Sequence, residues 1–248
     1  MDKIKSAYNS RFYERQIDGS LRSARVIMNR LFQIYEPQRV VDVGCGRGAW
    51  LKAAIECGAH LAHGFDGPWN DSAQMLDLQI SYMSVDLNER IVSKSKYDLA
   101  ISVEVAEHLM PTSARRFIES LCALSDVVLF SAAFKSQGGT QHINEQRHSY
   151  WGYLFRESGY EVFDHFRPFL WGNNEVVSYY RQNCFLYLKE NSSVHDTFLR
   201  HGSHAMVNLD FMDCMHPDVF LGENMGVRTH IYNMKYFMPR LFKRLVKR

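Results

Sequence analysis

Short apolar runs alternate with amphipathic segments along most of this chain. Strands are expected at residues 40–43, 61–65, 80–85, 99–103, 127–130, 160–163 and 184–188. Helices are expected at residues 21–35, 49–57, 112–124 and 150–158. Strands that alternate with helices are typical of parallel sheets covered on both faces. We therefore predict an α/β fold with a doubly wound, mostly parallel, seven-stranded Rossmann-like sheet.

The same pattern divides the chain into three parts. Residues 1–36 are expected to form an N-terminal helical cap, and residues 37–190 contain all the predicted strands. From residue 191 to residue 248 the periodicity weakens into a His- and Met-rich extension. We predict that this extension lies outside the core sheet.

Residues 40–48 read Val-Val-Asp-Val-Gly-Cys-Gly-Arg-Gly, an apolar strand followed by three alternating glycines. Glycines at Gly44 and Gly46, on either side of Cys45, let the backbone approach a ligand closely. Their spacing also fits the dinucleotide-binding pattern, so the glycines alone leave NAD open. Asp42 favours a cationic ligand, because a carboxylate at this loop repels a pyrophosphate. S-adenosylmethionine (SAM) carries an ammonium and a sulfonium, and we predict it as the cofactor.

Four acidic residues lie at or near the ends of four successive predicted strands: Asp42, Asp66, Asp86 and Glu104. Ligands bind at this edge of an open α/β sheet. A SAM-like ligand gives each a role, with Asp42 near the ammonium and Asp66 accepting from the ribose diol. Asp86 would accept from the adenine amino group, and the backbone N–H of Leu87 would face a nitrogen of the adenine ring. Glu104 would form the floor of the site near the reacting centre.

With these motifs in place, residues 39–188 resemble class I SAM-dependent methyltransferases. A narrower likeness is to a bacterial branch often associated with glycosyltransferases and surface-polysaccharide functions. It rests on the segments 18–25 (DGSLRSAR), 102–109 (SVEVAEHL), 131–133 (SAA), 138–146 (GGTQHINEQ), 149–151 (SYW) and 180–183 (YRQN). The resemblance implies a sugar or glycan hydroxyl as acceptor. Gln141 and the pair Arg147-His148 depart from that branch on the acceptor side.

Two groups of residues are candidates for activating a hydroxyl. If the chain turns helically after residue 103, Glu104, Glu107 and His108 share one face, and His142 from a later loop would complete a site for a divalent metal such as Mg or Mn. This arrangement resembles small-RNA 2′-O-methyltransferases and some quinone-pathway O-methyltransferases. Alternatively, Glu104 contacts the cofactor while Glu107 and His108 orient the next helix. In that case His142, after a Gly-Gly-Thr segment, is the preferred general base, with His108 as the second catalytic candidate.

The charge distribution limits the kind of partner, and the cysteines indicate the cellular compartment. The net charge is +2, but residues 235–248 hold six basic and no acidic residues, which leaves −4 for the rest of the chain. A mildly acidic body disfavours nucleic acid as a partner. The basic tail has an apolar face and either contacts an anionic membrane surface or packs on its own body. Five scattered cysteines, with neither a signal-peptide core nor a membrane-spanning run, lead us to expect a cytoplasmic protein.

The leading hypothesis is therefore SAM-dependent O-methylation of a sugar or glycan hydroxyl. The alternatives are methylation of another small molecule or of an RNA 2′-hydroxyl, an NAD-type dehydrogenase, and a non-catalytic SAM-fold partner in glycan assembly.

Overall fold

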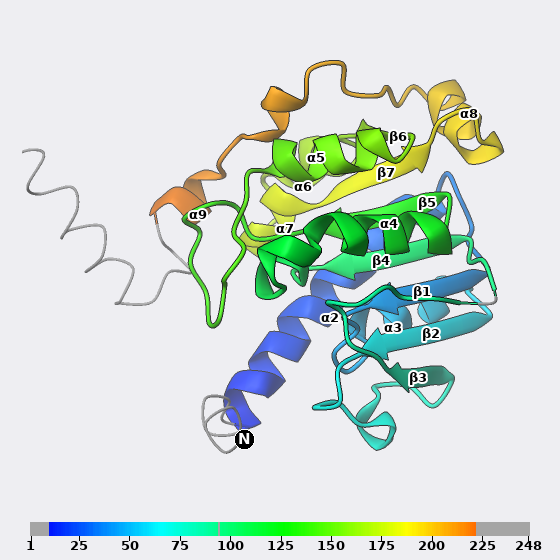
Figure 1. Cartoon of the computed structure of the whole chain (residues 1–248), viewed down its shortest axis with the longest axis vertical. Coiled ribbons are helices and arrows are strands. Elements are labelled where there is room, and N and C mark those ends of the chain that lie inside the picture. The colour runs from blue at the N-terminus through cyan, green and yellow to red at the C-terminus, as the bar shows by residue number, and fades with distance from the viewer. Residues whose placement is uncertain (1–9, 94, 222–248) are drawn as a thin grey trace, which may run out of the picture.

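Seven strands form one sheet in the computed structural model, which describes residues 10–93 and 95–221 (Figure 1). The strand order is β3-β2-β1-β4-β5-β7-β6. Neighbouring strands are parallel except that β7 runs antiparallel to both β5 and β6. The strands are β1 (Arg39–Val43), β2 (Leu61–Asp66), β3 (Ile80–Ser84), β4 (Leu99–Val103), β5 (Val127–Ser131), β6 (Tyr160–Phe163) and β7 (Phe185–Lys189). The predicted fold class is confirmed.

Helices connect and cover these strands. They are α2 (Ser10–Phe32), α3 (Ala49–Glu56), α4 (Ala114–Leu124), α5 (His148–Glu157), α6 (Arg167–Leu170), α7 (Ser178–Asn183), α8 (Ser193–Arg200) and α9 (Pro217–Leu221). Short 3₁₀ turns occur at η1 (Ser72–Gln74), η2 (Ala106–His108), η3 (Pro111–Ser113) and η4 (Leu209–Met212). The first helix begins earlier than predicted, at Ser10, and ends at Phe32 rather than at residue 35. Pro37 disfavours helical backbone at the residue before it, so the chain leaves the helix ahead of that point.

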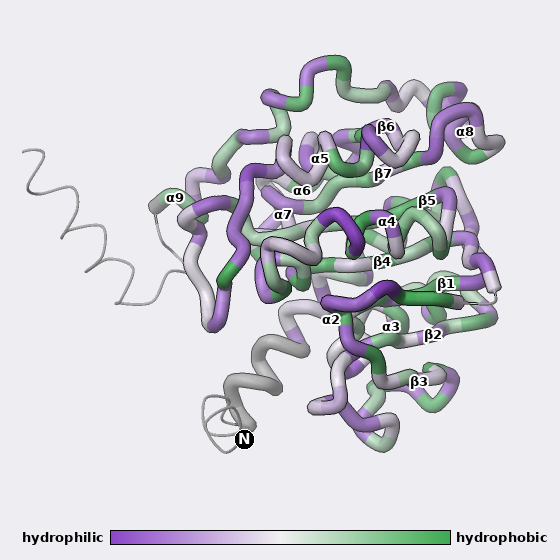
Figure 2. The backbone as a smooth tube through the Cα atoms, viewed as in Figure 1, coloured by the Kyte–Doolittle hydropathy of each residue, from purple (hydrophilic) through white to green (hydrophobic). Residues whose placement is uncertain are grey.

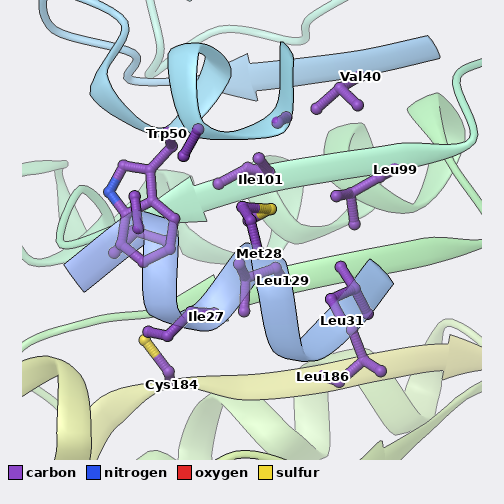
Figure 3. Close-up of a cluster of buried hydrophobic side chains, with 14 of the residues drawn as sticks. Ile27, Met28, Leu31, Val40, Trp50, Leu99, Ile101, Leu129, Cys184 and Leu186 are labelled. Carbon is purple, nitrogen blue, oxygen red and sulfur yellow. The ribbon is translucent and has the colours of Figure 1, made fainter. Parts of the chain in front are cut away.

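Two hydrophobic cores cover the two faces of the sheet. Successive strand side chains point to opposite faces, so β1 gives Val40 to one core and Val41 and Val43 to the other. Helices α2 and α3 pack on the first face, where Met28 and Trp50 lie over the strands (Figure 3). Helices α4 and α5 cover the second face (Figure 1). Burial on both sides explains why these strands read as continuous apolar runs.

Helix α2 contributes directly to the first core. Its side chains Ala24, Ile27, Met28 and Leu31 are fully buried against the sheet. The segment after β7 also packs on the body, because Phe198, Leu209 and Met212 are fully buried. This segment is therefore more closely joined to the core than the weak periodicity suggested.

The basic tail at residues 235–248 lies outside the described residues. Among the helices of residues 10–93 and 95–221, none is both long enough and apolar enough to cross a bilayer.

Candidate active site

The carboxyl ends of β1, β2, β4 and β5 lie along one edge of the sheet, because these strands are parallel (Figure 1). Asp42 lies within β1, Asp66 is the last residue of β2, and Glu104 follows β4. Such an edge is where open α/β sheets bind ligands. We call the loops after β1, β2 and β3 the cofactor side, and the loops after β4 and β5 the acceptor side.

The glycine loop between β1 and α3 is closely packed at one glycine and open at another. Gly44 has φ +86°, and a Cβ there would lie 2.3 Å from a methyl group of Val105. Only glycine fits such a position without strain. Gly46 also has a positive φ, +52°, but a Cβ there would meet no atom of the described residues within 4 Å. The loop is thus accessible at Gly46, where a ligand can approach the backbone.

The side chain between these glycines faces the protein interior. The Cys45 thiol packs over Gly64 of β2, where a Cβ would lie 2.6 Å from its sulfur. Burial raises the pKa of this thiol. Cys45 can therefore offer a ligand its backbone, but its thiol is neither ionised nor exposed.

Asp42 is a buried carboxyl that lacks a full set of partners. It is 2% exposed, and its Oδ2 has no hydrogen bond among the described residues. Burial raises its pKa well above the usual range, and the nearby carboxyl of Asp66 raises it further. An orphaned carboxylate oxygen is costly unless a donor or a cation pairs with it. The site therefore fits a ligand that brings a positive charge to Asp42.

Asp66 holds the glycine loop in place. Its Oδ2 accepts from the backbone N–H of Gly46 at 2.7 Å, and its Oδ1 accepts from that of Gly67 at 2.7 Å. Burial raises the pKa of Asp66, and these two hydrogen bonds partly oppose that rise. Hydrogen bonding from the side chains of Trp69 and Asn70 also opposes the rise of the Asp66 pKa, so a ligand hydroxyl would share or replace these partners.

Asp86 and Leu87 lie beyond the end of β3. Asp86 is exposed, and its carboxylate accepts from the backbone N–H of Asn88 at 2.9 Å. Leu87 is buried in the core beneath α4. Asn88 then joins the two sides of the site, because its Oδ1 accepts from the backbone N–H of Met110 at 2.9 Å. The predicted contacts of Asp86 and Leu87 with adenine stay predictions.

The helical turn after β4 that would bring Glu104 onto the face of Glu107 and His108 does not form. Glu104 has φ +56°, a conformation that side-chain-bearing residues rarely adopt, and η2 is a single 3₁₀ turn. Glu104 therefore does not share a helical face with Glu107 and His108. Its Oε1 instead accepts from Ser131 Oγ at 2.8 Å and from Asn183 Nδ2 at 3.0 Å. Burial raises the pKa of Glu104, and these hydrogen bonds oppose the rise.

Three of the four predicted metal ligands nevertheless converge. One ligand atom from each of Glu107, His108 and His142 lies within 4.8 Å of the others. Glu107 is fully buried, and among the described residues neither carboxylate oxygen makes a hydrogen bond of normal geometry. Burial, then the Glu104 carboxyl, raises the pKa of Glu107 well above its usual range, against a partial effect of nearby backbone N–H groups. Burial and the neighbouring His142 lower the pKa of His108. This donor set of one carboxylate and two imidazoles suits a divalent cation.

The loop between β5 and α5, residues 132–147, carries His142 over this cluster. The loop is largely hydrophilic (Figure 2). It is nevertheless fixed, because the backbone N–H groups of Ile143 and Asn144 both donate to the carbonyl of Glu107 at 2.9 Å. The His142 and His108 rings meet edge to face, with centroids 4.8 Å apart. His142 is thereby placed at the acceptor side, as the sequence predicted, although its catalytic role stays a prediction.

Comparison with known families decides the class of protein. A family described as "Methyltransferase domain" matches residues 13–169, more than half of the chain. The chain belongs to this family of methyltransferases. The predicted methyltransferase family is thus confirmed, and the dehydrogenase alternative does not fit it. No curated protein sequence matches the chain.

Solved structures of other methyltransferases share the fold. An O-methyltransferase family protein from Burkholderia thailandensis has a TM-score of 0.55 at 13% identity, covering 78% of this chain and 64% of its own. Magnesium protoporphyrin IX methyltransferase from Synechocystis, solved with bound S-adenosylhomocysteine (SAH), has a TM-score of 0.53 at 17% identity, covering 75% and 98%. The methyltransferase domain of bacterial CtHen1-C has a TM-score of 0.53 at 18% identity, covering 68% and 97%.

At such low identity these likenesses concern the fold alone. This chain covers 64% of the Burkholderia protein and 52% of human N-acetylserotonin methyltransferase, whose structure contains SAM. The magnesium protoporphyrin IX methyltransferase structures were solved with bound SAH and with bound SAM.

Sequence reasoning missed the residues that hold the acceptor side of this methyltransferase together. Asn183 is 1% exposed, and its amide donates to Glu104 Oε1 and to Gln137 Oε1, both at 3.0 Å. Glu145 accepts from two backbone N–H groups of the β5–α5 loop and lies within hydrogen-bond distance of His142 Nδ1. The side chains of Asn183, Gln137 and Glu145 are amides or carboxylates in or beside the quoted motifs. In the sequence, these residues could be recognised only as polar residues in or next to a motif, and no pattern indicated their partners.

Two of the motif segments meet in space. Ser20 Oγ lies 2.8 Å from the hydroxyl of Tyr180, and Ser23 Oγ accepts from the backbone N–H of Val177 at 3.0 Å. Helix α2 therefore supports α7, the helix whose last residue, Asn183, contacts Glu104.

Proposed function

We propose that the chain is a SAM-dependent O-methyltransferase whose acceptor is a hydroxyl of a sugar or glycan. The observation that carries the cofactor assignment is the orphaned, buried oxygen of Asp42 beside an accessible glycine loop. SAM supplies an electrophilic methyl group when bound. Asp42 would hold its ammonium, Asp66 would accept from its ribose, and Asp86 with the backbone of Leu87 would face its adenine.

The acceptor side has to take a proton from the hydroxyl, because an alcohol is a poor nucleophile near neutral pH. His142 is the proposed general base, since it lies over the cluster on a fixed loop. His108 faces it edge to face and is the nearest alternative. Each imidazole can accept a proton only while it is neutral.

A second route is favoured by Glu107, whose buried carboxyl has no normal hydrogen bond among the described residues. A divalent cation such as Mg²⁺ or Mn²⁺ would act there as a Lewis acid that favours loss of the hydroxyl proton. Glu107, His108 and His142 would hold it. Glu104 is held by Ser131 and Asn183, so we assign it to orienting the floor of the site rather than to metal binding.

The sugar or glycan acceptor rests on the sequence resemblance to the polysaccharide-associated branch. The acidic body of the chain disfavours RNA as an acceptor. The basic tail, which would suit a membrane-bound glycan, lies outside the described residues.

The test is calorimetry with SAM, followed by methyl-transfer assays on nucleotide sugars, free glycans and a short RNA, each with and without EDTA. We expect SAM binding and transfer to at least one sugar-bearing acceptor. Loss of activity in EDTA, restored by Mn²⁺, supports the metal route. Full activity in EDTA contradicts it and leaves His142 as the base. Transfer to RNA alone contradicts the glycan assignment, and absence of SAM binding favours a non-catalytic partner.

A further inference from the structure

Glu145 is a carboxylate of the β5–α5 loop to which the methyltransferase reaction above assigns no role. Its Oε1 lies 2.9 Å from Nδ1 of His142, and both side chains are largely buried, at 17% and 13% exposure. The same carboxylate accepts from the backbone N–H of Ser136 at 2.9 Å and of Gly138 at 2.7 Å. Glu145 is thus anchored at the loop backbone before it reaches His142.

We propose that Glu145 is a positioning residue that keeps the proton of neutral His142 on Nδ1 and so leaves Nε2 as its free lone pair. An ionised carboxylate only accepts hydrogen bonds, so the proton between the two groups belongs to Nδ1. The hydrogen bond of one imidazole nitrogen sets which nitrogen is available for chemistry. This inference rests on the proposed function for its catalytic consequence, but the tautomer itself does not depend on any bound group.

Gly139 supports the same orientation from the other side. A Cβ at Gly139 would lie 2.2 Å from both Cε1 and Nε2 of the His142 ring, so a side chain there would cover Nε2. Only a residue without a side chain lets the ring lie so close to the backbone. The neighbouring anchors of Ile143 and Asn144 on the Glu107 carbonyl fix the chain just after His142. The ring is therefore confined by Gly139, by Glu145 and by the backbone that leads to Glu107.

This confinement explains how one loop serves either proposed route. With Nδ1 engaged by Glu145, Nε2 is the nitrogen that remains for a hydroxyl proton or for a cation held with Glu107 and His108. The outer partners of such histidines commonly affect metal affinity or activity by about 10–100-fold. We expect changes of that size when Glu145 is altered.

The decisive experiment is ¹⁵N NMR of histidine side chains in the full chain at pH 8, with the His142 signal assigned from a His142→Gln sample. The native protein should show the Nδ1–H tautomer. In Glu145→Gln the single amide oxygen must serve three donors, so the Nε2–H tautomer should appear. If Glu145→Gln keeps only the Nδ1–H form, the proposal is wrong. Glu89→Gln, at an exposed surface ion pair, is the matched control and should leave the His142 signal unchanged.

Two further measurements separate positioning from loss of fold and from failure of the proposed function. Mn²⁺ affinity, measured by electron paramagnetic resonance, and kcat should each fall about 10–100-fold in Glu145→Gln, while the KM for SAM stays within about twofold. Gly139→Ala should move the ring and lower kcat, whereas Gly172→Ala, whose Cβ would enter open space, should not. If the native chain methylates nothing, the proposed function fails while the tautomer result still decides the role of Glu145. Unchanged kcat and Mn²⁺ affinity in Glu145→Gln would refute the positioning role.

Discussion

The cofactor side and the acceptor side of the site are built in different ways. On the cofactor side the key carboxyls belong to regular strands, with Asp42 inside β1 and Asp66 at the end of β2. On the acceptor side they belong to irregular backbone, because Glu104 has a positive φ and Glu107 sits in a single 3₁₀ turn. Strand geometry places the first set. The second set is placed by hydrogen bonds from other segments, which run from Ser131 and Asn183 to Glu104 and from the backbone of residues 143 and 144 to the Glu107 carbonyl.

This difference predicts that the two sides can be disabled separately. A substitution on the acceptor side should abolish chemistry and leave SAM affinity intact. A substitution in β1 should weaken SAM affinity and leave the acceptor side in place.

The largest expected effect is that of Glu107→Gln. Burial raises the pKa of Glu107 well above its usual range, so the empty site disfavours a charged carboxylate, and an uncharged amide of the same shape fits there. The fold should therefore survive, while turnover falls by about 10²-fold or more, the scale at which catalytic groups act. Steady-state kinetics with SAM calorimetry checks this. Glu119→Gln, at an exposed ion pair with Arg90, is the control. A tenfold loss of SAM affinity in Glu107→Gln would show that the two sides are not separable.

A smaller effect is expected for Asp42→Asn. Burial raises the pKa of Asp42 well above its usual range, and its Oδ2 has no partner among the described residues. An amide removes the cost of holding an ionised carboxyl there, so the empty protein should be at least as stable as the native one. SAM affinity should fall by about 10–100-fold, because charge-assisted hydrogen bonds contribute roughly 1.5–3 kcal/mol.

Calorimetry and thermal melting of Asp42→Asn, set against exposed Asp210→Asn, measure the two effects together. Undiminished SAM affinity would contradict the proposal that Asp42 binds the SAM ammonium. A marked fall in melting temperature would mean that Asp42 serves the fold.

The same contrast explains what could be predicted from the sequence. Short apolar runs that alternate with helical segments revealed the sheet and placed Asp42, Asp66 and Glu104 at one edge, because hydrophobic patterning is a local property and parallel strands end at the same edge. Glu107, His108 and His142 also converge as expected. Glu104 does not share a helical face with Glu107 and His108, because the side chain of Glu104 is held by Ser131 and Asn183 from distant segments. Glu145 and Asn183 were missed for the same reason: their partners are defined by a folded loop and by contacts across the sheet.

The smallest expected effect concerns pH and the support of the acceptor side. His148 is buried between the Met212 carbonyl and the Asn183 amide, and burial lowers its pKa to about 4. A histidine whose pKa is lower in the folded state than in the unfolded chain stabilises the fold above pH ~6.5 and loses that stabilisation as the pH falls toward 4. Its contribution to the unfolding free energy should drop by about 2 kcal/mol between pH 7.5 and pH 5.

The raised pKa values of Asp42 and Glu107 act in the opposite direction, since those carboxyls favour the folded state as the pH falls. The His148 contribution must therefore be measured as a difference between the native protein and His148→Gln, by urea unfolding at both pH values. The variant should be less stable at pH 7.5 by more than it is at pH 5. Because Asn183 joins His148 to Glu104, hydrogen exchange at pH 5 should speed up first at residues 134–148 and later at the glycine loop. Equal protection from hydrogen exchange at residues 134–148 and at the glycine loop at pH 5 would contradict the difference between the two sides of the site.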